Sequence, residues 1–398
     1  MRINLVKFLN FLFLLYIPID CINGLIIRST DISISSIFKT LILILLIKFF
    51  FDKKIYKPLY FFIVFLIFYF IRSFSLTSSS LDFMWGIKFI SIVFSYFYFR
   101  YLVTNRDYKI LFYLAYSSFF IIVFNVFVGS LGYGYQQYSR EGIGTRGFFY
   151  AGNELGVLLI STCFIILSKY NVENNHFKFY VYSLVAIVCS SFLTTKSSIL
   201  GVVILVTVIP LINFKFNLSE LKLSRSSFKF LLFSSFILFF VFPLFVYFIL
   251  FELDLISRLS TYYYRFDIFT LIFSGRDLAL NEVTELYNNM ASAYNLYFGV
   301  GFDWLLNNLG HSVELDFVDF FLIFGILGLI WIFICLKYIY SDIKILNFKL
   351  FPFKKLVLFF FFFLLVLSSL SGHVFNSGLA GYMIGLCFSL SHIQYSIK

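Results

Sequence analysis

Apolar stretches recur along the whole chain, and each is long enough to cross a lipid bilayer as a helix. Runs of about 18 to 22 predominantly apolar residues follow one another between short polar segments, and about 20 such residues span the ~30 Å hydrocarbon layer. A spanning backbone has no water to bond with, so helices are favoured. The 398 residues are 61% hydrophobic and only 13% charged, which excludes a water-soluble enzyme of this size. The sequence therefore predicts an all-α, polytopic integral membrane protein.

Hydropathy and the polar breaks predict about twelve transmembrane helices in a single transmembrane domain, 1–398. The expected spans are 4–22, 33–51, 58–75, 81–100, 110–128, 152–168, 179–195, 197–212, 230–251, 316–336, 356–371 and 376–393. Two connecting segments stand out. Residues 129–151 form the first functional loop that we expect, and residues 252–315 form a large, partly helical loop of a length that is commonly functional.

The net charge of +11 raises the question of a nucleic acid partner. About two thirds of the 31 Lys and Arg residues fall in alternate connecting segments, on the side of the N-terminus. By the positive-inside rule, both termini are then cytoplasmic. The basic surplus is explained by topology, and no nucleic acid partner is expected.

The cysteines and the common motifs give no sign of a bound metal or cofactor. All five cysteines fall in or beside predicted spans, without the spacing of metal ligands. The chain has no Walker loop and no dinucleotide-binding glycine motif. We therefore expect no metal and no cofactor, and no ATP-driven pumping by this chain alone.

The loop 129–151 is the most glycine-rich stretch of the chain and carries two arginines. Arg140 precedes Glu141 and can be satisfied by it, whereas Arg146 has no acidic neighbour in sequence. Arg146 is therefore the better candidate to meet an external anion.

The long loop 252–315 contains a helix-start signal. Ser274 and Asp277 fit the pattern S/T-x-x-D/E, and apolar residues follow at helical spacing. This predicts a short amphipathic helix on the outer face of the membrane, with Arg276 in its first turn, where free N–H groups and the helix dipole favour an anion. Pairing of Arg276 with Asp277 or with a lipid headgroup remains an open alternative. Arg265 lies upstream in the same loop.

Acidic residues and a histidine gather where the long loop returns to the membrane. Glu314, Asp316 and Asp319 follow His311 closely, whereas His373 is assigned to a short outer turn. We predict that His311 acts as a general base or orients a substrate. Glu314 would hold its ring or act in its place. A structural role for His311 remains open.

Three stretches together resemble the O-antigen polymerase family, relatives of the O-antigen ligases. They are TRGFFYAGNELG at 145–156, SGRD at 274–277 and HSVELDFVDFFLIFGILGLI at 311–330. Ligases usually have Asn after the histidine, and Ser312 stands there in this chain, which favours a polymerase. The Arg-x10-Gly repeat of some polymerases is absent, so their two-loop mechanism is not carried over.

The resemblance implies a metal-independent glycosyltransferase of the bacterial inner membrane, with its active site facing the periplasm. Such an enzyme joins undecaprenyl-pyrophosphate-linked oligosaccharide repeat units, which serve as donor and acceptor in the lipid bilayer. A chain-length-regulating membrane protein is a further partner typical of the family. An O-antigen ligase and a lipid-linked oligosaccharide flippase are the alternatives. The long loop and the lack of a visible half-repeat argue against the flippase.

The chemistry of this reaction suggests roles for five residues. Breaking a glycosyl–pyrophosphate bond develops negative charge on the leaving oxygens, which arginines stabilise with paired donors. The acceptor hydroxyl must lose a proton to a nearby base. We assign the pyrophosphate to Arg146, Arg265 and Arg276, and the acceptor hydroxyl to His311, with Glu314 as its substitute. The assignment requires the arginines to converge on one site.

Overall fold

The computed structural model describes residues 4–30, 33–74, 80–138, 143–212, 270, 273–289 and 292–394, and it is almost entirely helical. Among these residues, nine helices are long and apolar enough to cross a membrane. They are α1 (Leu5–Thr30), α2 (Ile34–Asp52), α3 (Tyr56–Ser73), α4 (Ser80–Thr104), α5 (Lys109–Ser130), α6 (Gly152–Val172), α7 (His176–Leu193), α16 (Asp316–Ile345) and α17 (Lys354–Ser371). These are the features of a multi-pass membrane protein, as the sequence predicts.

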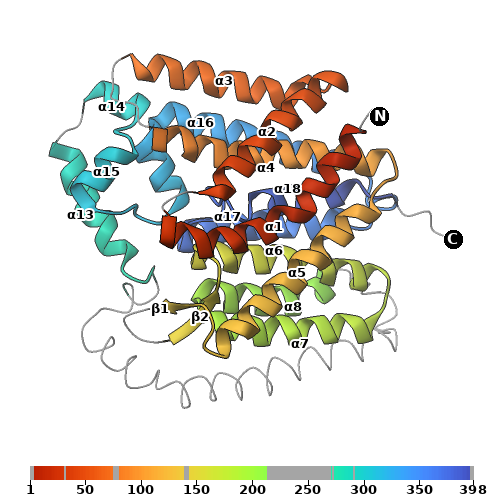
Figure 1. Cartoon of the computed structure of the whole chain (residues 1–398). Helices are drawn as coiled ribbons and strands as arrows, with labels where there is room; N and C mark the ends of the chain where they lie inside the picture. Colours follow the sequence, from red (N-terminus) through yellow and green to blue (C-terminus); the bar gives the residue numbers. More distant parts are fainter. Residues whose placement is uncertain are drawn as a thin grey trace, which may run out of the picture.

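The long helices run back and forth beside one another, so that the connections gather at two ends of the bundle (Figure 1). One end, here called the hairpin end, carries a two-stranded antiparallel hairpin of β1 (Tyr135–Tyr138) and β2 (Ile143–Gly147). The short helices α13 (Arg276–Asn289), α14 (Ala293–Phe298) and α15 (Phe302–Leu309) lie there too. The first and last described residues lie toward the other end, the terminal end.

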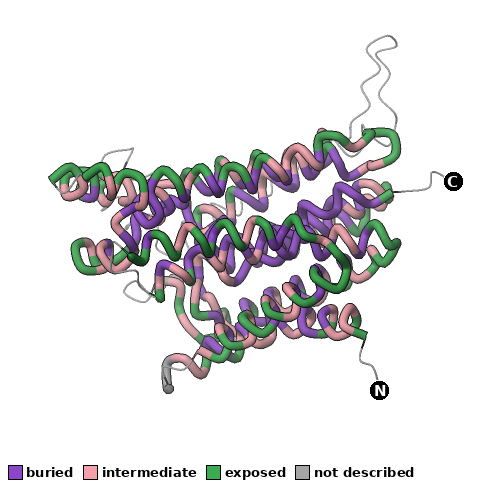
Figure 2. Tube along the Cα trace, turned by 90° about the horizontal axis from the view of Figure 1, so that it is seen from above, coloured by how far each residue is buried: buried purple, intermediate pink, exposed green. Residues whose placement is uncertain are grey.

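Burial increases from the outer helices to the middle of the bundle (Figure 2). Large apolar side chains such as Tyr60 and Phe70 are exposed on α3, where lipid rather than water would cover them. By contrast, α4 and α6 are mostly buried, and α18 (Gly381–Ser389) is buried throughout. A helix that is apolar all round belongs in such a core.

Two glycines explain how closely α18 packs on α4. Gly381 and Gly385 lie one turn apart and form a small-xxx-small pattern, which lets helix backbones approach closely in membrane proteins. A Cβ atom on Gly385 would lie 2.6 Å from the carbonyl oxygen of Ile92, and one on Gly381 would lie 2.6 Å from Ser91 Oγ. The contact at Gly385 is with backbone and would force the two helices apart, whereas the Ser91 hydroxyl beside Gly381 can turn away.

The expected span 197–212 appears as α8 (Lys196–Ile212), an apolar helix of 17 residues, and the expected span 230–251 lies outside the described residues. The expected span 376–393 is wrong in extent: the helix is only Gly381–Ser389, followed by a 3-10 turn, η2 (Leu390–His392). Residues 372–380 before it are not helical, and buried carboxylates bond to their backbone.

The helices α13 to α15 are tied to a break in α16. Gly325 has φ +67 inside α16, and the nearby Leu322 carbonyl accepts hydrogen bonds from Val300 N (2.7 Å) and Gly301 N (3.3 Å) in the link between α14 and α15. A Cβ on Gly325 would lie 2.4 Å from the backbone of Tyr297. Kinks have identifiable causes, and here glycine makes room for the inserted link.

Candidate functional site

The predicted helix with Arg276 in its first turn is present, although it begins at Arg276 and not at Ser274, which lies in the preceding turn, and it directs Arg276 toward an acid that is distant in sequence. Helix α13 begins at Arg276, and Asp277 accepts a hydrogen bond from Thr270 Oγ1 at 2.5 Å. Arg276 Nη2 lies 2.8 Å from Glu314 Oε2 in the turn before α16. The alternative that Arg276 pairs with Asp277 is therefore wrong, because Asp277 is held by Thr270 and Arg276 by Glu314.

His373 lies on the other side of the same carboxylate. Its Nε2 atom lies 3.6 Å from Glu314 Oε1. The sequence suggested that His311 is the histidine beside the acids, but His311 is exposed and its Nδ1 lies 2.7 Å from the carbonyl oxygen of Ser312. A catalytic role for His311 stays a prediction. The three residues Arg276, Glu314 and His373 are called the triad below.

Both turns that carry the triad are in unusual backbone conformations. Glu314 has φ +62 and His373 has φ +55, the left-handed region that costs most residues about 1–2 kcal/mol. The turns pack backbone against backbone, since a Cβ on Gly372 (φ +59) would lie 2.1 Å from the carbonyl oxygen of Glu314. Residues held in this region cluster at functional sites more often than elsewhere.

The triad shifts the pKa values of its own members. Burial acts to raise the pKa of Glu314, but His373, through a hydrogen bond and its charge, and Arg276 outweigh it and lower that pKa to about 2. Burial acts to lower the pKa of His373, but Glu314, Glu154 and Asp316 together raise that pKa above 6.5. Glu314 is therefore ionised, and its charge favours the protonated form of His373.

Glu154, on α6, holds the non-helical segment that carries His373. Its Oε2 atom accepts hydrogen bonds from Ser377 Oγ and Leu379 N, both at 2.8 Å. Non-helical backbone is tolerated at membrane depth only where protein groups satisfy it. We therefore assign Glu154 a structural role at the start of α18.

Asp316 and Asp319, on the first turn of α16, fix the two turns of the triad. Asp316 Oδ2 accepts hydrogen bonds from Val374 N (2.9 Å) and Phe375 N (2.7 Å), next to His373. Asp319 Oδ1 accepts from Val313 N (2.9 Å), next to Glu314. Both aspartates are buried. Through these backbone hydrogen bonds, the two aspartates position the turns that carry Glu314 and His373.

Lys196 is a further cation near Arg276 that the sequence analysis gave no role. It begins α8, and its Nζ atom lies 3.1 Å from Ser274 Oγ, two residues before Arg276. The charges of Lys196 and Arg276 are close enough to interact. Because like charges repel, the pair adds to the attraction of this end for anions.

Arg146 and Arg265 are not brought to Arg276 by the described contacts. Arg146 lies on β2, where Nη1 bonds to the carbonyl oxygen of Tyr150 (2.6 Å) and the guanidinium lies 6.0 Å from the ring centre of Tyr135. The hairpin packs on the turn between α7 and α8, near Thr194. Arg265 lies outside the described residues. The convergence of the three arginines stays a prediction.

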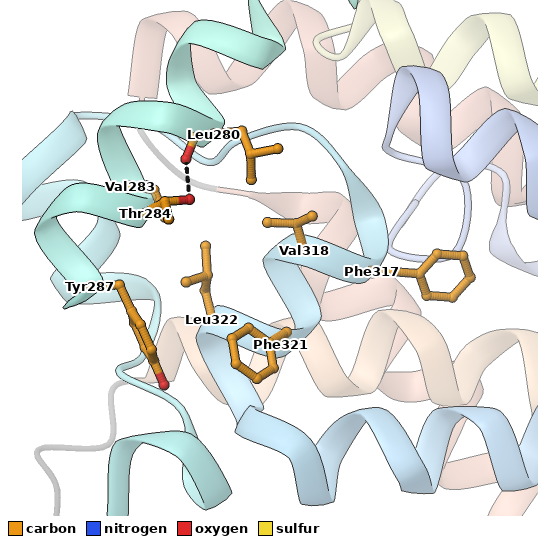
Figure 3. A pocket seen from close by; sticks show the side chains of 8 residues that line it. All are labelled: Leu280, Val283, Thr284, Tyr287, Phe317, Val318, Phe321 and Leu322. Carbon is orange, nitrogen blue, oxygen red and sulfur yellow. Dashed lines mark hydrogen bonds between the residues drawn. The ribbon is translucent and has the colours of Figure 1, made fainter. Parts of the chain in front are cut away.

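An apolar cavity opens between α13 and α16 (Figure 3). Its volume is about 340 Å³. The lining residues are Leu280, Val283, Thr284, Tyr287, Phe317, Val318, Phe321 and Leu322. The hydroxyl of Thr284 is bonded to the carbonyl oxygen of Leu280 in its own helix, at 2.7 Å. Leu280 is one helical turn after Arg276, so the apolar lining of the cavity begins one turn away from the triad.

No protein-family model matches the chain, and no curated protein or solved structure is detectably similar to it. The functional argument therefore rests on the residues themselves.

Proposed function

We propose that the protein is an O-antigen polymerase. In this reading it is a metal-independent glycosyltransferase of the bacterial inner membrane that joins undecaprenyl-pyrophosphate-linked oligosaccharide repeat units at the periplasmic face. The hairpin end would face the periplasm, in agreement with the positive-inside rule.

One observation supports the proposal most directly: Arg276 pairs with the carboxylate of Glu314 and stands one helical turn before Leu280, which lines the apolar cavity between α13 and α16. An arginine in a first helical turn suits a phosphate group, and a hydrocarbon-lined cavity suits an isoprenoid chain. A lipid-linked diphosphate carries both groups in one molecule. A soluble sugar nucleotide would have no use for the cavity.

Glycosyl transfer would use the same residues. The acceptor hydroxyl attacks the anomeric carbon of the donor while the bond from that carbon to the diphosphate oxygen breaks. Arg276, helped by Lys196, stabilises the negative charge that develops on the diphosphate. Glu314, 2.8 Å from Arg276, is close enough to the leaving group to receive the acceptor proton. Arg146, Arg265 and His311 keep the roles that the sequence suggests as proposals of lesser support.

Replacement of Arg276 tests the proposal. In a strain that lacks the protein, Arg276→Ala should restore normal membrane levels but leave the lipopolysaccharide core with a single repeat unit. Loss of a charge-stabilising donor typically costs about 100-fold or more in rate. Arg276→Lys should give shorter ladders, because Lys keeps the charge but loses the paired donors.

Arg100→Ala is the matched control. Arg100 also pairs with a carboxylate, Asp342, at 2.6 Å, but at the terminal end of the bundle. It should leave the ladder intact. An unchanged ladder in Arg276→Ala would refute the assignment. An uncapped core in cells without the protein would indicate a ligase instead.

A further inference from the structure

Arg276, Glu314 and His373 come from three separate parts of the chain, and the two oxygens of Glu314 have different partners. Oε2 faces Arg276 at 2.8 Å, and Oε1 faces His373 at 3.6 Å. The side chain of Glu314 is 39% exposed, whereas those of Arg276 and His373 are 14% and 22% exposed. The carboxylate can therefore be reached by a substrate, and both of its partners are more buried than it is.

The two contacts differ in how firmly they are held. His373 is fixed by its own turn, which is bonded to Asp316 through Val374 N and Phe375 N. Arg276 has a long side chain that also donates to the carbonyl oxygen of Phe273, at 3.4 Å. An incoming diphosphate competes with Glu314 for both cations, but the long side chain of Arg276 can follow the anion, whereas the imidazole of His373 is held by its turn.

We propose that His373 is a positioning residue that holds Oε1 of Glu314, so that Oε2 becomes the proton acceptor when an anionic donor draws Arg276 away. The inference rests on the proposed function and names the base within it. The acceptor O–H bond breaks, and its proton goes to Oε2. The acceptor oxygen forms the new bond to the anomeric carbon. The bond from that carbon to the diphosphate breaks, and its electron pair leaves with the diphosphate. Arg276 stays bound to the diphosphate during this step.

The charges around His373 favour the protonated form of its imidazole. Four carboxylates face it from different elements: Glu314 from the turn before α16, Asp316 and Asp319 from α16, and Glu154 from α6. Arg276 lies beyond Glu314. A cationic His373 keeps Glu314 ionised even after Arg276 leaves, so the carboxylate is ready to accept a proton.

His373→Asn tests the inference through the pH dependence of transfer. Asn tolerates a positive φ but cannot carry the charge. In detergent solution, with lipid-linked repeat units extracted from the producing strain, wild-type protein should transfer at similar rates at pH 5 and pH 7. Without the charge of His373, the pKa of Glu314 should rise from about 2 to or above the usual 4.5, so His373→Asn should lose at least about a quarter of its pH 7 rate at pH 5.

His392→Asn is the matched control, since His392 lies 3.5 Å from the carboxylate of Asp342 at the terminal end. It should keep the wild-type profile. If His373→Asn keeps the wild-type rate and profile, the inference is overturned while the proposed function stands. If wild-type protein transfers no repeat units, the proposed function fails instead.

An NMR titration of the histidine imidazoles separates the two failures without any substrate. Glu314→Gln removes a negative charge beside His373, so the pKa of His373 should fall relative to wild type. An unchanged titration of His373 would show that the pair does not form, whatever the protein catalyses.

Discussion

A buried ion pair holds the short helices at the hairpin end, and breaking it should be costly. Arg72 Nη1 lies 2.8 Å from Asp82 Oδ2, and neither side chain is more than 1% exposed. Asp82 Oδ1 also accepts from Phe302 N at 2.6 Å, at the start of α15. Asp82→Ala therefore removes the counter-charge of Arg72 and one anchor of the segment that follows α13.

The expected loss is large for a single substitution. Removing one member of a buried ion pair typically costs about 3–5 kcal/mol, because the other charge is left buried and uncompensated. Loss of the partner of Phe302 N adds about 1 kcal/mol. The double variant Arg72→Met/Asp82→Leu should be less destabilised than Asp82→Ala alone, because it leaves no buried charge. Arg100→Ala, which opens a partly exposed pair (30% and 17%), should cost about 1 kcal/mol or less.

Buried thiols give a direct assay for these variants. Four cysteines, Cys163, Cys189, Cys335 and Cys387, are free and buried. They should react with a fluorogenic maleimide only as the protein unfolds on heating in detergent. The apparent unfolding temperature should fall most in Asp82→Ala, less in the double variant and least in Arg100→Ala. A double variant as unstable as Asp82→Ala would refute the reasoning.

Three further predictions follow from the cavity, the packing and the titrating pair. Leu280→Trp should partly fill the cavity, so transfer from a donor with a long isoprenoid chain should fall more than transfer from a short-chain analogue; equal losses would argue against lipid binding there. Gly385→Val should abolish accumulation of folded protein in membranes, because its Cβ would lie 2.6 Å from a backbone oxygen of α4, whereas Gly132→Ala, with nothing within 4 Å, should lose only about 1 kcal/mol from its positive φ. The Glu314–His373 pair should stabilise the fold most between about pH 4.5 and 6.5. The stability that Glu314 contributes is lost as the pH falls toward its pKa of about 2. The stability that His373 contributes is lost as the pH rises through its raised pKa. Thermal unfolding of wild type and Glu314→Gln from pH 4 to 9 checks this window, and a pH-independent difference would contradict it.

The sequence was informative where one local pattern decides the structure. A long apolar run has few alternatives to a helix in lipid, so the expected span 110–128 appears as α5, Lys109–Ser130. The signal at Ser274 likewise indicated α13, which begins two residues later, at Arg276. The run 376–393 is apolar too, but its first residues are not helical, because their hydrogen bonds are made to acids from other helices. Apolar composition does not reveal such partners.

The same reason explains why His373 was overlooked. In sequence it is 59 residues from Glu314, and the arginine that completes the triad is 38 residues from Glu314 on the other side. Three residues of the local sequence nevertheless fit the position of His373: Gly372 permits the backbone contact with Glu314, and Ser377 and Gly378 interrupt the helical pattern. An isolated histidine in a break of an apolar run that contains glycine and serine can thus pair with an acid that is distant in sequence but lies at the same end of the bundle. His311 was suggested only by its closeness to the acids in sequence, and its Nδ1 atom lies beside the carbonyl oxygen of its neighbour Ser312.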